Sequence, residues 1–230
     1  MIRGVMLLHS ESVEMYLKSL AELGGAQSPV PIARVAERKG VTQVSANEMM
    51  KRLGDQGYVR HTPYKGVTLT RAGRGLAHSV IRRQRLWECF LVEQLNLDWA
   101  RAHAVACELE HATAPDVVDA LEEFLGHPTV CPHGNPIPDR NGEMEALPDT
   151  TLAALEPGQS ARVLAIQADS TDVFEYLQKR GILPQQLVSV IETAPFDESL
   201  TLKIGEQDVT LGCKLAELVV VGLLDPAQEN

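Results

Sequence analysis

Residues 31–70 carry an ordered set of helix and strand signals that few small folds can accommodate. A first short helix is predicted over residues 31–39, because the proline that opens it suits a first helical turn. A second helix is predicted over residues 45–56, where Ser45-Ala-Asn-Glu matches a capping box. Two β-prone stretches between residues 58 and 70 flank a turn-rich tip and predict a hairpin. Helix, turn, helix and hairpin together predict a winged helix-turn-helix.

Charge is distributed unevenly along the 230 residues. The net formal charge is −10, yet residues 1–76 carry eleven Lys and Arg against six Asp and Glu, a balance of +5. Residues 77–142 have a balance of −5 and residues 143–230 one of −10. Because Lys and Arg neutralise phosphates, the basic first third is the part of the chain predicted to bind DNA.

The second helix of a winged helix enters the major groove with its N-terminal residues toward the bases. In this chain those residues are Ser45, Ala46 and Asn47. Asn47 is the favoured base contact, since the Ser45 hydroxyl is predicted to cap the helix. Winged helices also serve as protein-interaction modules, and the positive balance favours DNA over that alternative. Three cations are predicted to contact phosphates: Lys51, Arg60 and Lys65.

Four potential metal ligands lie on one face of a third predicted helix. His103, Cys107, Glu110 and His111 are spaced i, i+4, i+7 and i+8, and Asp98 is the predicted N-cap. Three readings of this stripe stay open. It can belong to a metal-dependent regulator, to a regulator with a purely structural metal, or to a zinc hydrolase in which Glu110 acts as base. Ordinary packing of single His and Cys residues is the fourth, less specific alternative.

A long helix is predicted between the hairpin and this stripe, over residues 70–95. Trp87 and Phe90 lie side by side on it and are a predicted dimer contact, which a pseudo-palindromic DNA site would require. Gln84 and Glu88, four residues apart, can reach a common ligand from another part of its surface. Further along, Cys131-Pro-His133 offers only two donors, so we predict a rigid loop that covers the helices rather than a metal site.

The remaining composition predicts the compartment. No apolar run approaches the roughly 20 residues that a membrane span requires. The apolar stretch within residues 1–9 is too short for a secretory signal, and the four cysteines show no paired spacing. We therefore expect a cytoplasmic protein with neither a membrane partner nor an organic cofactor.

Several of these motifs together resemble the diphtheria toxin repressor family of metal-activated transcription regulators. The resemblance spans residues 1–140, and residues 159–226 resemble the SH3-like, FeoA-like domain of the longer iron-type members. It implies a mainly α fold with small β parts. The expected domains are a winged helix-turn-helix (1–76), a helical metal-binding and dimerisation domain (77–141), a linker (142–158) and the SH3-like domain (159–226). The motifs are Met15-Tyr-Leu17, Leu69 to Ala77, the stripe at 103–111, and Gly134-Asn-Pro-Ile-Pro138.

The resemblance also implies two metal sites in each subunit. The primary site would consist of Met15, Cys107, Glu110 and His111. The ancillary site would consist of Gln84, Glu88 and His103, with Arg85, Cys131 and Asn135 lining a small anion site beside it.

This chain departs from the family pattern at the ancillary site. The family has His at the position of Gln84, and its two C-terminal-domain donors align with Ser170 and Val173. Valine cannot bind a metal, so Asp169 or Asp172 is the expected substitute.

The resemblance implies a homodimeric regulator of metal-homeostasis genes rather than an enzyme. Fe(II) or Mn(II) is the expected effector, and the soft donors of the primary site favour iron. Metal binding by donors from separate elements is predicted to fix the DNA-binding form of the dimer.

Overall fold

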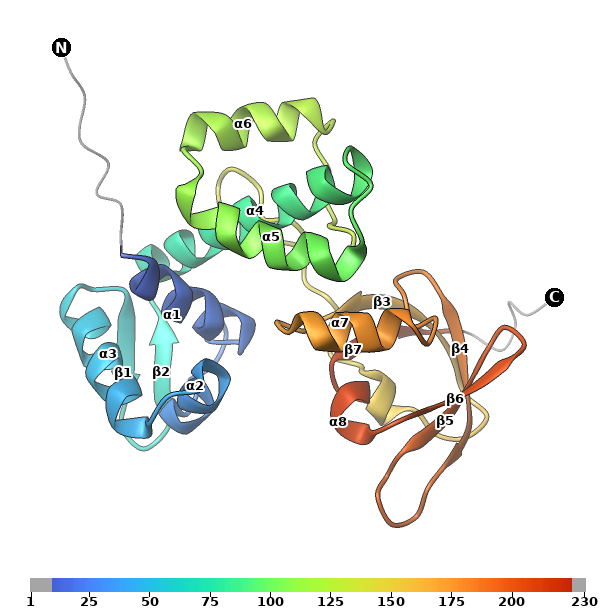
Figure 1. Ribbon diagram of the computed structural model, residues 1–230. Helices are drawn as coiled ribbons and strands as arrows, with labels where there is room; N and C mark the ends of the chain where they lie inside the picture. The colour runs from blue at the N-terminus through green and yellow to red at the C-terminus, as the bar shows by residue number, and fades with distance from the viewer. Residues whose placement is uncertain (1–9, 225–230) are drawn as a thin grey trace. The chain divides into compact units, whose positions relative to one another are not determined.

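The computed structural model describes residues 10–224, and these divide into two compact units (Figure 1). The first contains the described residues up to 83 together with residues 138–143. The second contains residues 84–137 and the described residues from 144 onward. The predicted absence of a signal sequence concerns residues 1–9, which lie outside the described residues. Within residues 10–224, no helix is long and apolar enough to cross a membrane.

The first unit is a winged helix-turn-helix, as predicted. Three helices precede a two-stranded antiparallel sheet, and the first half of a long fourth helix follows (Figure 1). Their bounds are α1 Glu11–Glu22, α2 Ile32–Lys39, α3 Gln43–Asp55, β1 Val59–Thr62, β2 Gly66–Leu69 and α4 Arg71–Glu93. Leu17, Leu20, Met50 and Leu53 are fully buried in one apolar cluster, so α1 and α3 share a core.

The hairpin, or wing, is anchored to the segment before α2. Val30 and Val67 exchange backbone hydrogen bonds of 2.8 and 3.0 Å. Gly66 has φ 122°, and a Cβ at that position would lie 2.0 Å from the Val30 carbonyl oxygen. Only glycine fits this approach, so the base of the wing has a fixed position beside α2.

The predicted start of α3 was wrong by two residues. Thr42 is the N-cap, and its side chain accepts a 3.2 Å hydrogen bond from the Ser45 backbone N–H. Ser45 therefore lies inside the first turn, and the predicted capping box with Glu48 is not the helix start. With Thr42 as the N-cap, the Ser45 N–H is itself one of the orphan donors of the first turn, and the Thr42 side chain satisfies it.

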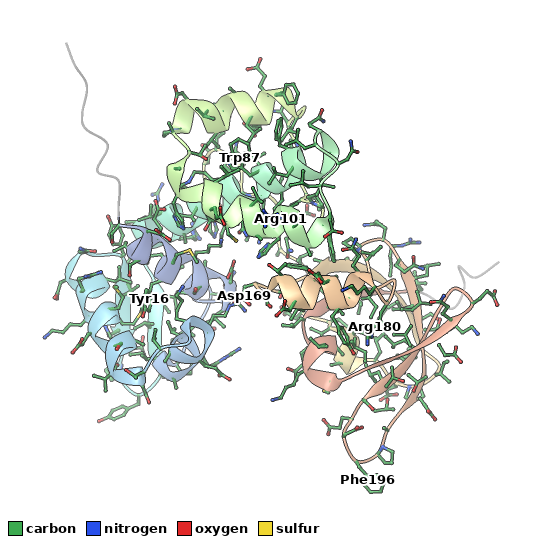
Figure 2. All side chains as sticks on the ribbon, viewed as in Figure 1. Tyr16, Trp87, Arg101, Asp169, Arg180 and Phe196 are labelled. Atoms are coloured by element: carbon green, nitrogen blue, oxygen red, sulfur yellow. The ribbon has the colours of Figure 1, made fainter. Side chains whose placement is uncertain are left out.

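The helical part of the second unit consists of the rest of α4, α5 (Trp99–Ala112) and α6 (Pro115–Phe124). Asp98 caps α5 as predicted, since its carboxylate accepts hydrogen bonds from Ala100 N (3.0 Å) and Arg101 N (3.3 Å). Trp87 is half-buried among the helices (Figure 2). Its indole N–H donates to the Thr113 hydroxyl at 2.7 Å.

The C-terminal part of the second unit is a five-stranded antiparallel sheet with the order β6-β5-β4-β3-β7. A small antiparallel β domain is what the resemblance to the SH3-like domain implied for this part of the chain. Thr151 pairs with Val220, and Leu152 is fully buried, so part of the segment predicted as a linker packs on this sheet. The bounds are η1 Leu152–Ala154, β3 Ser160–Ile166, α7 Thr171–Gln178, β4 Leu187–Thr193, β5 Leu200–Ile204, β6 Gln207–Leu211, α8 Cys213–Ala216 and β7 Val219–Leu223.

Candidate metal centre

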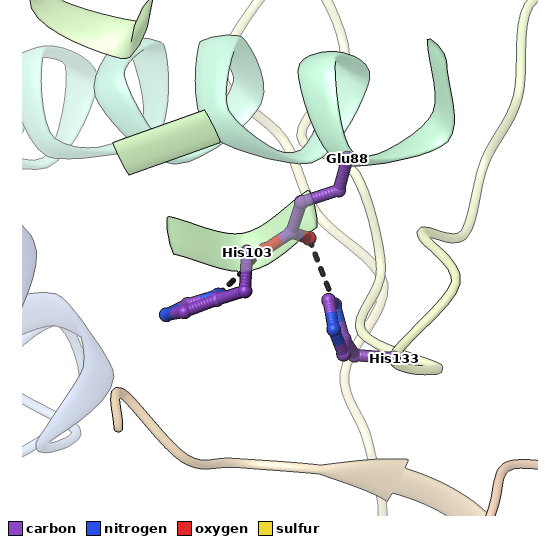
Figure 3. A group of neighbouring side chains, drawn as sticks. All are labelled: Glu88, His103 and His133. Atoms are coloured by element: carbon purple, nitrogen blue, oxygen red, sulfur yellow. Dashed lines mark hydrogen bonds and ion pairs between the residues drawn. The ribbon is translucent and has the colours of Figure 1, made fainter. Parts of the chain in front are cut away.

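Three buried side chains from separate elements of the second unit converge on one point. They are Glu88 of α4, His103 of α5 and His133 of the loop after α6 (Figure 3). One ligand atom of each lies within 4.8 Å of the others, and all three residues are at most 6% exposed. The sequence predicted that Glu88 and His103 share a site. It missed His133, which was expected to belong to a covering loop only.

The Glu88 carboxylate lies between the two imidazoles. One of its oxygens is 2.8 Å from His103 Nδ1 and the other is 3.2 Å from His133 Nδ1 (Figure 3). A buried carboxylate that faces two ring nitrogens needs positive charge between them, supplied either by protons or by a cation.

The surroundings of His133 fix which of its nitrogens is available. Its Nε2 lies 3.2 Å from the Trp99 carbonyl oxygen, which only accepts hydrogen bonds, so Nε2 carries a proton. In the neutral ring, the Nδ1 lone pair then points at the Glu88 carboxylate. Metal-binding histidines typically donate their other N–H to a backbone carbonyl in this way. The arrangement therefore fits a divalent cation.

Without a cation, protons hold the cluster together. Burial by itself would raise the pKa of Glu88, but the charge of His133 and hydrogen bonds from both histidines hold this pKa well below its ordinary value. Burial would lower the pKa of His103, but hydrogen bonds with Cys107 and Glu88 raise it to about 10. Cation binding at this centre therefore has to displace a proton from His103.

Gln84 connects this centre to the metal stripe. It is buried, its amide nitrogen lies 3.2 Å from Cys107 Sγ, and the same nitrogen lies 3.3 Å from His103 Nδ1. Cys107 belongs to the predicted primary site and His103 to the predicted ancillary site. The Gln84 amide thus contacts one member of each donor set.

The C-terminal part of the chain contributes an aromatic ring to the centre. The Phe174 ring centroid lies 4.3 Å from that of His133 and 4.6 Å from that of His103, and Phe174 is 1% exposed. Val173 packs in the neighbouring core, while Asp169 and Asp172 are exposed. Within residues 10–224, the buried donor group is completed by His133 and contains neither aspartate.

Cys131 places a sulfur atom beside the centre. Its sulfur lies 4.0 Å from His133 Nδ1, and burial together with the nearby Glu88 raises its pKa well above the ordinary value. The thiol is therefore protonated in the metal-free protein. The other predicted anion-site residues make intramolecular contacts: Arg85 donates to the Pro136 carbonyl and Asn135 to the Ile166 carbonyl at 2.8 Å.

The stripe on α5 keeps its predicted arrangement within the second unit. Cys107 and His111 are half-buried, while Glu110 is fully buried with a carboxylate oxygen 3.3 Å from His111 Nε2. Met15 is half-buried on α1 and belongs to the first unit. Its place in the primary site therefore stays a prediction.

Most of the predicted DNA contacts are solvent-accessible, with one correction. The exposed ones are Ser45, Asn47, Lys51, Arg60 and Lys65. Ala46 is fully buried, so its prediction as a base contact was wrong: with α3 starting at Gln43, this position faces the core. Gln43 and Val44, which were predicted to precede the helix, instead lie exposed on its first turn.

Comparison with known proteins identifies all three parts of the chain. Residues 9–67 match the family described as iron dependent repressor, N-terminal DNA binding domain. Residues 70–139 match the iron dependent repressor metal binding and dimerisation domain, and residues 150–222 match the FeoA domain.

Similar proteins extend over nearly the whole chain. The iron-dependent repressor IdeR of Mycobacterium leprae is 32% identical over 92% of this chain and 96% of its own length. The diphtheria toxin repressor of Corynebacterium efficiens is 32% identical over 75% of this chain and 79% of its own. A solved structure, a manganese-dependent transcriptional repressor in complex with manganese, has a TM-score of 0.82 at 32% identity and covers 92% of this chain and all of that one.

Proposed function

The chain belongs to the iron-dependent, or diphtheria toxin, repressor family of metal-dependent DNA-binding regulators, and on that premise we propose that it senses Fe(II) or Mn(II) through two metal sites in each subunit. The family members bind operator DNA as homodimers. Their similarity to this chain supports the interpretation that the α5 residues belong to a metal-dependent regulator and not to a zinc hydrolase.

The main support for this proposal is the buried group of Glu88, His103 and His133. These side chains would hold one divalent cation, with Cys131 as a further donor. Glu88 supplies the negative charge, while the contact of His133 Nε2 with the Trp99 carbonyl keeps Nδ1 directed at the centre. The His that the family has at position 84 is thus replaced by a His from a different segment.

The donor set is borderline between hard and soft. A carboxylate, two imidazoles and a thiol suit Mn(II), Fe(II) and Zn(II). In the general order of affinities for divalent ions, Zn(II) binds such a site more tightly than Mn(II) or Fe(II) does. Availability in the cell, rather than intrinsic affinity, then selects Fe(II) or Mn(II) as the effector.

The second proposed site combines Met15 with Cys107, Glu110 and His111. Met15 belongs to the helix that shares a core with α3, so its binding to the same ion as the α5 donors would restrict the orientation of the DNA-binding unit. Metal and DNA binding are then coupled, and each strengthens the other by typically 1–3 kcal/mol.

The proposed DNA contacts follow the observed start of α3. Asn47 remains the main base-reading residue, and Gln43 and Val44 join it, since an amide pairs with adenine and a methyl group contacts thymine. The phosphate contacts are Lys51, Arg60 and Lys65, and Ser45 keeps an exposed position on the first turn.

One set of DNA mobility shifts tests this function. Full-length protein is titrated onto duplexes selected from a random library, with Mn(II), anaerobic Fe(II), Zn(II) or a chelator present. Binding that appears only with metal is expected, and metal-independent binding would contradict the proposal. Circular dichroism of the chelated protein distinguishes this function from the alternative of a purely structural metal. In that alternative, removal of the metal by the chelator unfolds the chain.

Substitution of His133 tests the centre itself. His133→Ala is expected to lower the metal bound per subunit, measured by elemental analysis after equilibrium dialysis against Mn(II). His127→Ala is the matched control, because this His lies six residues away in the same segment and its side chain is 64% exposed. Equal metal content in the two variants would remove His133 from the site.

A further inference from the structure

The tip of the wing presents a large aromatic side chain directly to solvent. Tyr64 lies between β1 and β2 and is fully exposed, with a relative accessibility of 108%. Its φ of 62° falls in the left-handed region, which Tyr rarely adopts. The backbone hydrogen bond from Lys65 N to the Thr62 carbonyl, 3.1 Å long, closes the turn around it. Folding of the unit thus leaves the Tyr64 ring on the outside of a tight turn.

The wing holds this ring at a defined place. Val59, Arg60, His61 and Thr62 pair in register with β2, and Gly66 packs against the Val30 carbonyl. A groove of about 410 Å³ runs from the start of α2 to the wing tip. Its lining includes Gln43 and Asn47 of α3 together with Tyr64 and Lys65. The tip therefore shares one face with the end of α3 that is proposed to read bases.

The chemistry of the wing fits a polyanion. Residues 56–70 contain no Asp or Glu but include Arg60, His61 and Lys65, all of which are exposed. The charged side chains of Arg60 and Lys65 neutralise phosphates. The Tyr64 side chain has no basic group and cannot do so. An exposed ring beside phosphate-binding cations is suited to the less polar parts of DNA, the deoxyriboses and base edges.

We propose that Tyr64 is the minor-groove contact of the wing, its ring packing against deoxyribose and base edges beside the major-groove segment read by α3. This inference rests on the proposed DNA-binding function. It assigns the wing two separable contributions: an electrostatic one from Lys65, and an apolar, salt-independent one from Tyr64. Aromatic contacts of this kind tolerate many sequences, so Tyr64 contributes affinity more than sequence specificity.

Affinity as a function of salt separates the two contributions. Full-length, Mn(II)-loaded protein is titrated onto a fluorescent duplex selected from a random library, at several KCl concentrations. Tyr64→Ala is expected to bind about tenfold more weakly with the salt slope unchanged, whereas Lys65→Ala lowers the slope by about one. Tyr64→Phe keeps the ring and is expected to bind like the unsubstituted protein.

Phe196→Ala is the matched control, since Phe196 is another fully exposed aromatic, 98% accessible, at the turn between β4 and β5 in the acidic part of the chain (Figure 2). This variant should bind DNA normally. Melting temperature and Mn(II) content should be unchanged in every variant, because neither ring is packed in a core.

Footprinting locates the contact. Hydroxyl radicals attack deoxyribose from the minor groove, and dimethyl sulfate methylates guanine N7 in the major groove. Tyr64→Ala should lose hydroxyl-radical protection at the flanks of the site and keep its dimethyl sulfate protection.

Unchanged affinity in Tyr64→Ala, or a reduced salt slope equal to that of Lys65→Ala, would overturn the inference. Intact hydroxyl-radical protection in that variant would do the same. Failure of the unsubstituted, metal-loaded protein to bind any selected duplex would instead refute the proposed function, and the inference with it.

Discussion

Replacement of Glu88 by Gln isolates the charge at the buried centre. The amide side chain nearly matches the volume of the carboxylate but carries no negative charge, so the packing around His103 and His133 is largely kept. The pKa of His103 lies at about 10 against an ordinary value of 6.5, which corresponds to at most about 5 kcal/mol of preference for the protonated ring. Cys107 provides part of this preference. We therefore expect Glu88→Gln to destabilise the metal-free protein by about 3 kcal/mol at pH 6.

The effect should depend on pH with a defined sign. The pKa of His103 is raised in the folded protein, so its stabilising contribution is complete below pH 6.5 and declines as the pH rises toward about 10. The pKa of Glu88 is lowered, so its contribution is present above its ordinary pKa of 4.5 and declines in acid as the pH falls toward the folded-state pKa. The difference between the unsubstituted protein and Glu88→Gln should thus be largest between about pH 4.5 and 6.5 and small at pH 10.

Urea unfolding in the presence of a chelator, repeated from pH 4.5 to pH 10, measures this difference. Glu93→Gln is the control, because Glu93 is exposed on the same helix and should change the stability little at any pH. The same variants are then dialysed against Mn(II), where only Glu88→Gln should lose bound metal. A stability difference that is constant across the pH range would refute the argued coupling between Glu88 and His103.

Three further substitutions test other parts of the structure. Gly66→Ala places a Cβ against a backbone carbonyl, so we expect a loss of at least about 1–3 kcal/mol in urea unfolding, together with weaker DNA binding; unchanged values would show that the wing base is not held as described. Asp98→Ala removes the N-cap of α5 and should cost about 1 kcal/mol by the same assay, and no loss would contradict the capping role. Gln84→Ala removes the hydrogen bond to Cys107, so in a Cys213→Ser background Cys107 should react faster with a thiol reagent in the absence of metal, while an unchanged rate would argue against that contact.

Local sequence signals were sufficient wherever neighbouring residues decide the structure. The Asp98 cap, the α5 helix and the wing hairpin depend on spacing and turn chemistry within a few residues, and each forms as predicted. The start of α3 was missed for a related reason. Thr42 and Ser45 are both good caps, and the choice between them depends on how the helix packs, since Ala46 is fully buried and Val44 is exposed.

The composition of the candidate metal centre depends on tertiary structure. His133 lies thirty residues beyond His103 in a Pro-rich loop, and no periodic pattern relates the two. The loop is held by backbone contacts with β3: Ile166 N donates to the His133 carbonyl at 2.9 Å, and a Cβ on Gly134 would lie 1.9 Å from the Leu164 carbonyl oxygen. The sequence alone was enough to predict the family, most of the elements, and two of the three members of this buried group, Glu88 and His103. Only the packing of this loop on the sheet decided the third, because residues distant in the chain meet only through long-range contacts.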